Sequence, residues 1–183
     1  SKAEKVAEGC DSLYLGMIKV AQADTYNNTY NSIEELNCSQ DALKILREVG
    51  AEKYLRPTMF SLGKAYHNCD KYQEAIQIYK SLIESSTEVD FYTIQAYLGL
   101  AYSMIELPLT NYKTVCDLFE KVHILDETCF SENDYWAWAY SLYRIDKSAE
   151  AEEITAYYAE NFGDKMPKEI MDNLAILKEN CSK

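Results

Sequence analysis

Two histidines, His67 and His123, are the side chains of this 183-residue chain that titrate near neutral pH and could act as general bases. A histidine base works when it is held beside a nucleophile or a metal ion. Neither histidine has such a partner at helical spacing, and neither lies in a glycine-rich loop or a nucleophile elbow. Both fall near the predicted C-terminus of a helix, where a cationic side chain interacts favourably with the helix dipole. We therefore expect a protein that is not an enzyme.

The six cysteines lack the spacing that metal binding requires. Zinc sites use clustered ligands such as C-x-x-C pairs, and the sequence contains no such pair. We expect reduced, packed thiols and no bound metal. No phosphate-cradling loop is present either, so we expect no cofactor. The cysteines are Cys10, Cys38, Cys69, Cys116, Cys129 and Cys181.

The composition is strongly acidic, with a formal net charge of −12 and a pI near 4.6. Such a surface repels nucleic-acid phosphates and anionic membranes, and no apolar run reaches the length of a membrane span. The reduced thiols expected above favour a cytoplasmic or nuclear protein. Three glycosylation-type triplets, at Asn27, Asn37 and Asn180, leave a lumenal location as the minor alternative. The paired acids Glu34/Glu35, Glu106/Asp117 and Glu152/Glu153 are predicted to lie on solvated faces.

Hydrophobic periodicity predicts an all-α protein that forms a single domain over residues 1–183. An amphipathic helix covers residues 3–25, and the stretch 26–38 breaks the periodicity and is predicted to be an irregular loop. Repeated helices follow over residues 39–162, with Ser39 and Asp90 as helix N-caps, Gly50 as a stop and Pro57 in a first helical turn. A last helix over 167–181 brings the expected total to about nine helices and no strand.

A set of large and small residues recurs in three successive helix pairs. Each first helix carries a leading residue, an apolar residue three positions on and a tyrosine four positions after that. In the first two pairs a glycine directly follows the apolar residue. Each second helix carries two core positions four residues apart. The sets are Met59, Leu62, Gly63 and Tyr66 with Ala75 and Tyr79; Gln95, Leu98, Gly99 and Tyr102 with Val115 and Phe119; and Trp136, Ala139, Tyr140 and Tyr143 with Ala151 and Thr155. Ala42 and Leu46 are predicted to lie in the second helix of a preceding pair.

This arrangement resembles the tetratricopeptide repeat family, whose first helix reads W-x2-L-G-x2-Y and whose second reads A-x3-F. The resemblance covers residues ~40 to 162 and implies a right-handed superhelix of antiparallel helix pairs, with residues 167–181 as a C-terminal capping helix. The chain departs from the pattern in two places. Leu107 to Thr110 look like a four-residue insertion between two helices, and Tyr140 replaces the small residue of the third pair, which should therefore be splayed or repacked.

The resemblance also implies a binding surface, because the first helices of such arrays line a concave groove that commonly holds peptides or helices. Aromatic residues and arginine dominate binding hot spots, so the expected ligand is an amphipathic helix or an extended apolar segment that carries an acidic group. Core packing is an equal alternative for Tyr97 and Trp138, and solvated charge is the alternative for Lys64 and Arg144. The predicted groove residues are Phe60, Lys64, His67, Tyr97, Leu100, Met104, Trp138, Ser141 and Arg144.

The sequence thus predicts a non-catalytic scaffold or adaptor module that binds a protein or peptide partner, whose identity it does not indicate. Two alternatives remain open. The chain could be a homodimerising structural subunit of a larger complex, or it could be the regulatory repeat domain of a longer enzyme.

Overall fold

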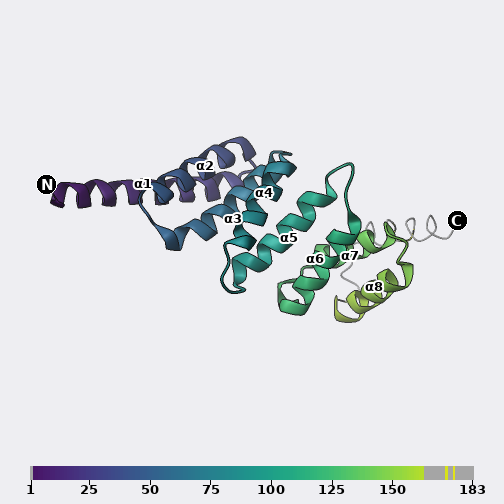
Figure 1. Cartoon of the computed structure of the whole chain (residues 1–183). Coiled ribbons are helices and arrows are strands. Elements are labelled where there is room, and N and C mark those ends of the chain that lie inside the picture. Colours follow the sequence, from purple (N-terminus) through teal and green to yellow (C-terminus); the bar gives the residue numbers. More distant parts are fainter. Residues whose placement is uncertain (1, 163–171, 173–174, 176–183) are drawn as a thin grey trace. The chain divides into compact units, whose positions relative to one another are not determined.

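The computed structural model describes residues 2–162 together with residues 172 and 175, and within these residues it is all-helical (Figure 1). None of the helices in this part of the chain is long and apolar enough to cross a membrane. The predicted capping helix, residues 167–181, lies outside the described residues apart from positions 172 and 175. The elements are α1 (Lys2–Asn28), α2 (Ser32–Glu48), α3 (Glu52–Asn68), α4 (Tyr72–Glu84), α5 (Phe91–Ile105), α6 (Tyr112–Leu125), the 3-10 helix η1 (Glu127–Cys129), α7 (Glu132–Tyr143) and α8 (Ser148–Phe162).

The chain divides into two compact units, and the boundary falls near the end of α5, between Ser103 and Met104. In the first unit, α1 packs on α2, α2 on α3 and α3 on α4. In the second unit, α6 packs on η1 and α7, and α7 packs on α8. Each unit therefore follows the predicted plan of consecutive helices that pack against one another.

Tyr79 of α4 fills the space opposite two glycines of the first unit. Its side chain is 2% exposed, and burial raises the pKa of its hydroxyl. A Cβ atom added at Gly63 of α3 would lie 2.6 Å from Tyr79 Cε1, and one added at Gly99 of α5 would lie 2.4 Å from Tyr79 Cζ. Helices α3 and α5 can approach this ring because neither glycine carries a side chain. Glycine at the small position of the repeated set therefore allows a close contact with α4 from both α3 and α5.

The second helices share a regular interval and a common buried face. Helices α2, α4 and α6 begin at Ser32, Tyr72 and Tyr112, an interval of 40 residues each time. This is longer than the 34 residues of a tetratricopeptide repeat. The three second helices bury the same three positions, which are Glu35, Ser39 and Ala42 in α2, Ala75, Tyr79 and Leu82 in α4, and Val115, Phe119 and Val122 in α6. Ala42 and Leu46 do lie in the second helix of a preceding pair, as predicted.

The irregular loop predicted over residues 26–38 is corrected by the structure. Helix α1 continues to Asn28, and α2 begins at Ser32 with Asn31 as its N-cap, so Ser39 lies inside α2 and is 1% exposed. The turn is short because Tyr30 adopts a left-handed conformation with φ of 56°, and the Asn31 N–H donates to the Tyr26 carbonyl at 3.0 Å. Glycine usually takes this position at a helix end. Because a tyrosine takes it here, the sequence does not indicate the turn.

The same turn recurs in other pairs. Asp70 and Asp146 are left-handed too, each with φ of 58°. The N–H of the residue that follows each of them donates to the carbonyl five positions before that residue. Gly50, with φ of 67°, follows the end of α2 as predicted. The predicted place of Pro57 is corrected, since α3 begins at Glu52 and Pro57 lies inside the helix. The connection between α5 and α6 is longer than that between α3 and α4, in agreement with the predicted insertion.

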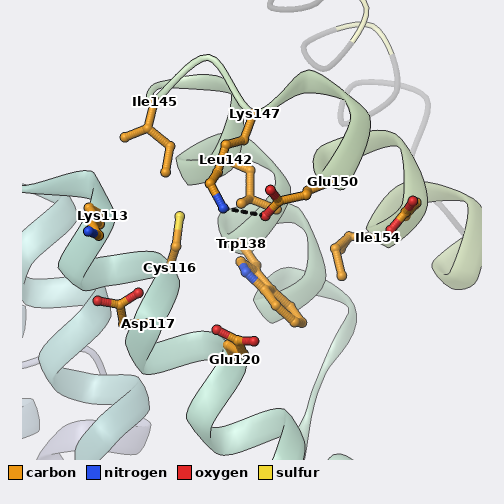
Figure 2. Close-up of a pocket in the computed structure, with 11 residues that line it drawn as sticks. Lys113, Cys116, Asp117, Glu120, Trp138, Leu142, Ile145, Lys147, Glu150 and Ile154 are labelled. Carbon is orange, nitrogen blue, oxygen red and sulfur yellow. Dashed lines mark hydrogen bonds and ion pairs between the residues drawn. The ribbon is translucent and has the colours of Figure 1, made fainter.

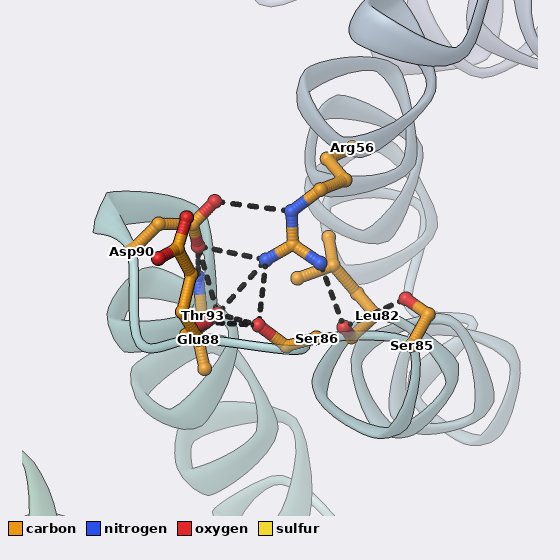
Figure 3. Close-up of polar contacts among 7 residues, drawn as sticks. All are labelled: Arg56, Leu82, Ser85, Ser86, Glu88, Asp90 and Thr93. Carbon is orange, nitrogen blue, oxygen red and sulfur yellow. Dashed lines mark hydrogen bonds and ion pairs between the residues drawn. The ribbon is translucent and has the colours of Figure 1, made fainter.

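Arg56 near the start of α3 joins three segments of the first unit (Figure 3). Its guanidinium donates to both carboxylate oxygens of Asp90, at 3.0 and 2.7 Å, and to the Leu82 carbonyl at 3.3 Å. It also donates to the hydroxyls of Ser86 and Thr93. Asp90 in turn accepts from the Thr93 N–H at 2.8 Å, which confirms it as the N-cap of α5. The Arg56 hydrogen bonds, with those of Thr93, hold the pKa of Asp90 well below its usual range.

Replacing Asp90 with asparagine is expected to lower the free energy of unfolding by about 1 kcal/mol at pH 7, because the cap is kept but the charged partner of Arg56 is lost. A carboxyl whose pKa is depressed by folding stabilises the protein above its unfolded pKa, about 3.9, and this contribution is lost as the pH falls below it. Urea unfolding at pH 7 and near pH 3 should therefore show a difference that shrinks with acid. Asp41→Asn, which breaks the pair between half-buried Lys19 and exposed Asp41, is the control, and an equal loss in both variants would contradict the prediction.

Aromatic side chains form the core of the second unit. Phe130, which follows η1, packs its ring edge-on against Phe119, Tyr135 and Trp138, with centroids 5.0 to 6.2 Å apart. Ser131 and Asp134 form a capping box at the start of α7, in which the Ser131 N–H donates to the Asp134 carboxylate at 2.6 Å.

Tyr140 of α7 takes the place where the first unit has a glycine. Its ring stacks on Trp136 with centroids 5.7 Å apart, and it meets the edge of Tyr112 at 5.8 Å. An aromatic cluster thus occupies this position of the second unit.

Candidate interaction cleft

The predicted groove residues of α3 are half-buried and engage neighbouring helices. The Phe60 ring lies 6.2 Å from that of Tyr92, and His67 Nδ1 lies 3.0 Å from the Ser103 hydroxyl of α5. Lys64, also half-buried, exerts an attraction on the buried Glu35 carboxylate of α2. These three side chains therefore serve helix packing in the first unit.

The predicted groove residues of α5 are less accessible still. Tyr97 is 9% exposed and Leu100 is 6% exposed, so both belong to the buried core. Met104, across the unit boundary, is half-buried, and its carbonyl accepts a hydrogen bond from the Thr110 hydroxyl. Of the two alternatives weighed for Tyr97, core packing describes its position in this structure.

The last three predicted groove residues, two in α7 and one at its C-cap, have different surroundings. Ser141 is fully buried, and its hydroxyl donates to the Ala137 carbonyl at 2.7 Å. Arg144 is exposed, lies over the Tyr112 ring at 4.8 Å and donates to the Tyr140 hydroxyl at 3.1 Å. Trp138 is 8% exposed and turns to another side of α7.

That side of α7 is the floor of a cleft with a volume of about 580 Å³, which lies within the second unit (Figure 2). Trp138, Leu142 and Ile145 follow one another at helical spacing along α7 and the turn after it. Helix α6 forms one wall and α8 the other. The walls carry Cys116 and Ile154 beside the floor, so the base of the cleft is apolar. Of the nine predicted groove residues, Trp138 lines this cleft.

The rim of the cleft is mainly acidic. It carries four carboxylates and two lysines: Asp117, Glu120, Glu150, Glu153, Lys113 and Lys147. Lys147 Nζ lies 2.7 Å from Glu150 Oε2, so one lysine is already neutralised by an ion pair. Within the described part of the chain, Asp117, Glu120 and Glu153 make no hydrogen bond or ion pair, and all three are exposed. Above its apolar floor, the cleft thus offers three carboxylates that make no hydrogen bond or ion pair in that part of the chain.

The groups beside the cleft that could do covalent chemistry are poorly placed for it. Burial, together with the Asp117 carboxylate, raises the pKa of Cys116 to about 12, so its thiol stays protonated near neutral pH. His123 lies in the last turn of α6, as predicted, and its ring meets those of Phe130 and Trp138, each at 5.5 Å. Its Nε2 is buried and has no hydrogen-bond partner among the described residues.

A buried carboxylate in the first unit corrects one prediction. Glu35, expected on a solvated face, is 3% exposed and accepts a hydrogen bond from Asn68 Nδ2 at 3.1 Å. Burial raises its pKa, and the Asn68 hydrogen bond opposes that shift. Glu35 occupies the position of Ala75 in α4, so it lies on the packed face of α2.

Sequence patterns did not identify the acidic rim as part of a site. The sequence predicts solvated acidic faces for Asp117 and Glu153, and both residues are exposed. The available signal was the second apolar stripe of α7, Trp138, Leu142 and Ile145, which is separate from the stripe that carries the repeated set. Compared with known proteins, the chain matches no family model, and no curated protein matches it either.

Proposed function

We propose that this chain is a non-catalytic interaction module that holds a short segment of another protein in the cleft between α6 and α8. The observation that carries the proposal is an open cleft of about 580 Å³ with an apolar floor and a polar rim. Binding sites for short segments combine an apolar anchor pocket with polar groups that fix orientation.

The repeat pattern supports the same function. Tetratricopeptide-like arrays are protein-binding scaffolds, and the proposal places this chain among such helical repeats. The phased Leu-Gly-x2-Tyr sets and the Gly63–Tyr79–Gly99 contact favour that assignment, whereas the interval of 40 residues departs from the family's 34. The proposed surface is not the groove that the sequence predicts along the first helices. Four of the nine predicted groove residues are buried: Tyr97, Leu100, Trp138 and Ser141.

Obstructing the cleft is expected to abolish partner capture. Ile154→Arg places a long cation over the floor, whereas Ile124→Arg makes the same change at a residue of α6 that is 76% exposed and does not line the cleft. Immobilised wild-type protein and both variants are incubated with native lysate, and captured proteins are quantified by mass spectrometry. We expect Ile154→Arg to reduce capture of the main partner at least about tenfold and Ile124→Arg to leave it within about twofold.

Circular dichroism must show that both variants keep the helix content and melting temperature of the wild type. Equal capture by all three folded proteins would contradict the proposed site. A change of oligomeric state in light scattering that follows Ile154→Arg would instead identify the occupant as a second copy of the chain.

A further inference from the structure

The charge of the cleft indicates the chemistry of its occupant, and this inference rests on the proposed function. Lys147 is paired with Glu150, so its charge is compensated inside the protein. The remaining charged residues that line the cleft are one lysine, Lys113, and three carboxylates, Asp117, Glu120 and Glu153. A segment that enters the cleft meets an excess of negative charge on both walls.

The positions of these charges along the helices make the excess local. Lys113 is the second residue of α6, and Lys147 directly precedes α8. Glu120 and Glu153 lie further along their helices, by seven residues from Lys113 and six from Lys147. The lysines therefore belong to the end of the cleft where α6 and α8 begin, and unpaired carboxylates predominate beyond it.

The floor sets a second requirement. Trp138 and Leu142 are almost completely buried, while Ile145 and Ile154 are half-buried and complete the apolar surface. A wholly polar segment would gain no affinity by covering this surface, whereas an apolar side chain gains affinity when it is removed from water there. The occupant must therefore carry at least one large apolar side chain together with its charges.

We propose that the cleft binds a basic, amphipathic segment of a partner protein. One or more large apolar side chains of the segment pack on Trp138, Leu142 and Ile154. Its lysine or arginine side chains pair with Asp117 and Glu120 on one wall and with Glu153 on the other. This assignment reverses the charge expected of the ligand from the first helices, where an acidic group was predicted. The net charge of −12 favours the approach of such a segment from a distance.

The test selects peptides from a random library of about twelve residues displayed on phage, with the whole chain immobilised. Enriched peptides are synthesised with a fluorescent label, and their affinities are measured by fluorescence anisotropy. The cleft variant is Asp117→Lys/Glu153→Lys. The matched control is Glu106→Lys/Glu160→Lys, which makes the same change in net charge at exposed residues of the same unit outside the cleft.

We expect the enriched peptides to be net basic with an apolar anchor, and to bind the cleft variant at least about tenfold more weakly than the wild type. The control should stay within about twofold, and raising NaCl from about 50 to about 500 mM should weaken wild-type binding several-fold. Equal weakening in both double variants would overturn the inference, because the attraction would then be general and not local to the cleft.

Two other outcomes separate the inference from the function on which it rests. Acidic or uncharged peptides that lose binding in Ile154→Arg would overturn the basic occupant and leave the cleft as a binding site. Enriched peptides that bind Ile154→Arg as well as wild type, or the absence of any enriched peptide, would overturn both the site and its proposed occupant.

Discussion

Alanine in place of Trp138 is expected to lower the free energy of unfolding by about 3–5 kcal/mol. The indole is 8% exposed and packs against His123 at 5.5 Å and Phe130 at 5.9 Å, so its removal opens a cavity in the aromatic core of the second unit. Urea unfolding followed by circular dichroism measures the loss. Trp138→Phe, which keeps an aromatic ring, should lose much less stability.

The burial of Trp138 and Tyr97 also limits which variants can test binding. The sequence predicts Trp138 and Tyr97 as groove residues. Both are buried, so a loss of binding in either alanine variant would mix unfolding with the loss of contacts. Ile154 and the exposed carboxylates of the rim separate the two effects. An unfolding free energy of Trp138→Ala within about 1 kcal/mol of the wild type would show that the indole is not part of the core.

Alanine in place of Gly99 is expected to destabilise the first unit by about 1–3 kcal/mol. The new Cβ would lie 2.4 Å from Tyr79 Cζ and 2.7 Å from both Cε atoms, and the ring cannot simply retreat because Gly63 contacts the same ring. The intrinsic preference of a helix for alanine over glycine, about 1 kcal/mol, acts in the opposite direction and should be outweighed. Thermal unfolding of the variant measures the balance.

Two comparisons make the Gly99 prediction specific. Gly16→Ala should cost less, because the nearest atom to its new Cβ is the flexible end of Leu46, at 2.9 Å. In a Tyr79→Leu background, Gly99→Ala should lose most of its effect, because the smaller side chain leaves room for the methyl group. A double-mutant cycle with no coupling between residues 79 and 99 would contradict the proposed contact.

Local features of the fold could be predicted from the sequence because each depends on a few neighbouring residues. The all-helical class follows from hydrophobic periodicity, the N-cap of α5 from Asp90 and the capping box from Ser131 and Asp134. The close contacts of Gly63 and Gly99 follow from their place in the repeated set. Each of these features appears within one or two helical turns, where residue type and spacing suffice.

Features that depend on residues distant in the sequence became clear only from the tertiary structure. Tyr30 forms a left-handed turn that normally takes glycine, so the end of α1 had no sequence signal. Glu35 is buried because Asn68 of α3 supplies its hydrogen bond. The cleft exists because α6 and α8, whose starts are 36 residues apart, flank the same stripe of α7. No single helix carries both the apolar floor and the acidic rim, so their combination arises only when the three helices pack.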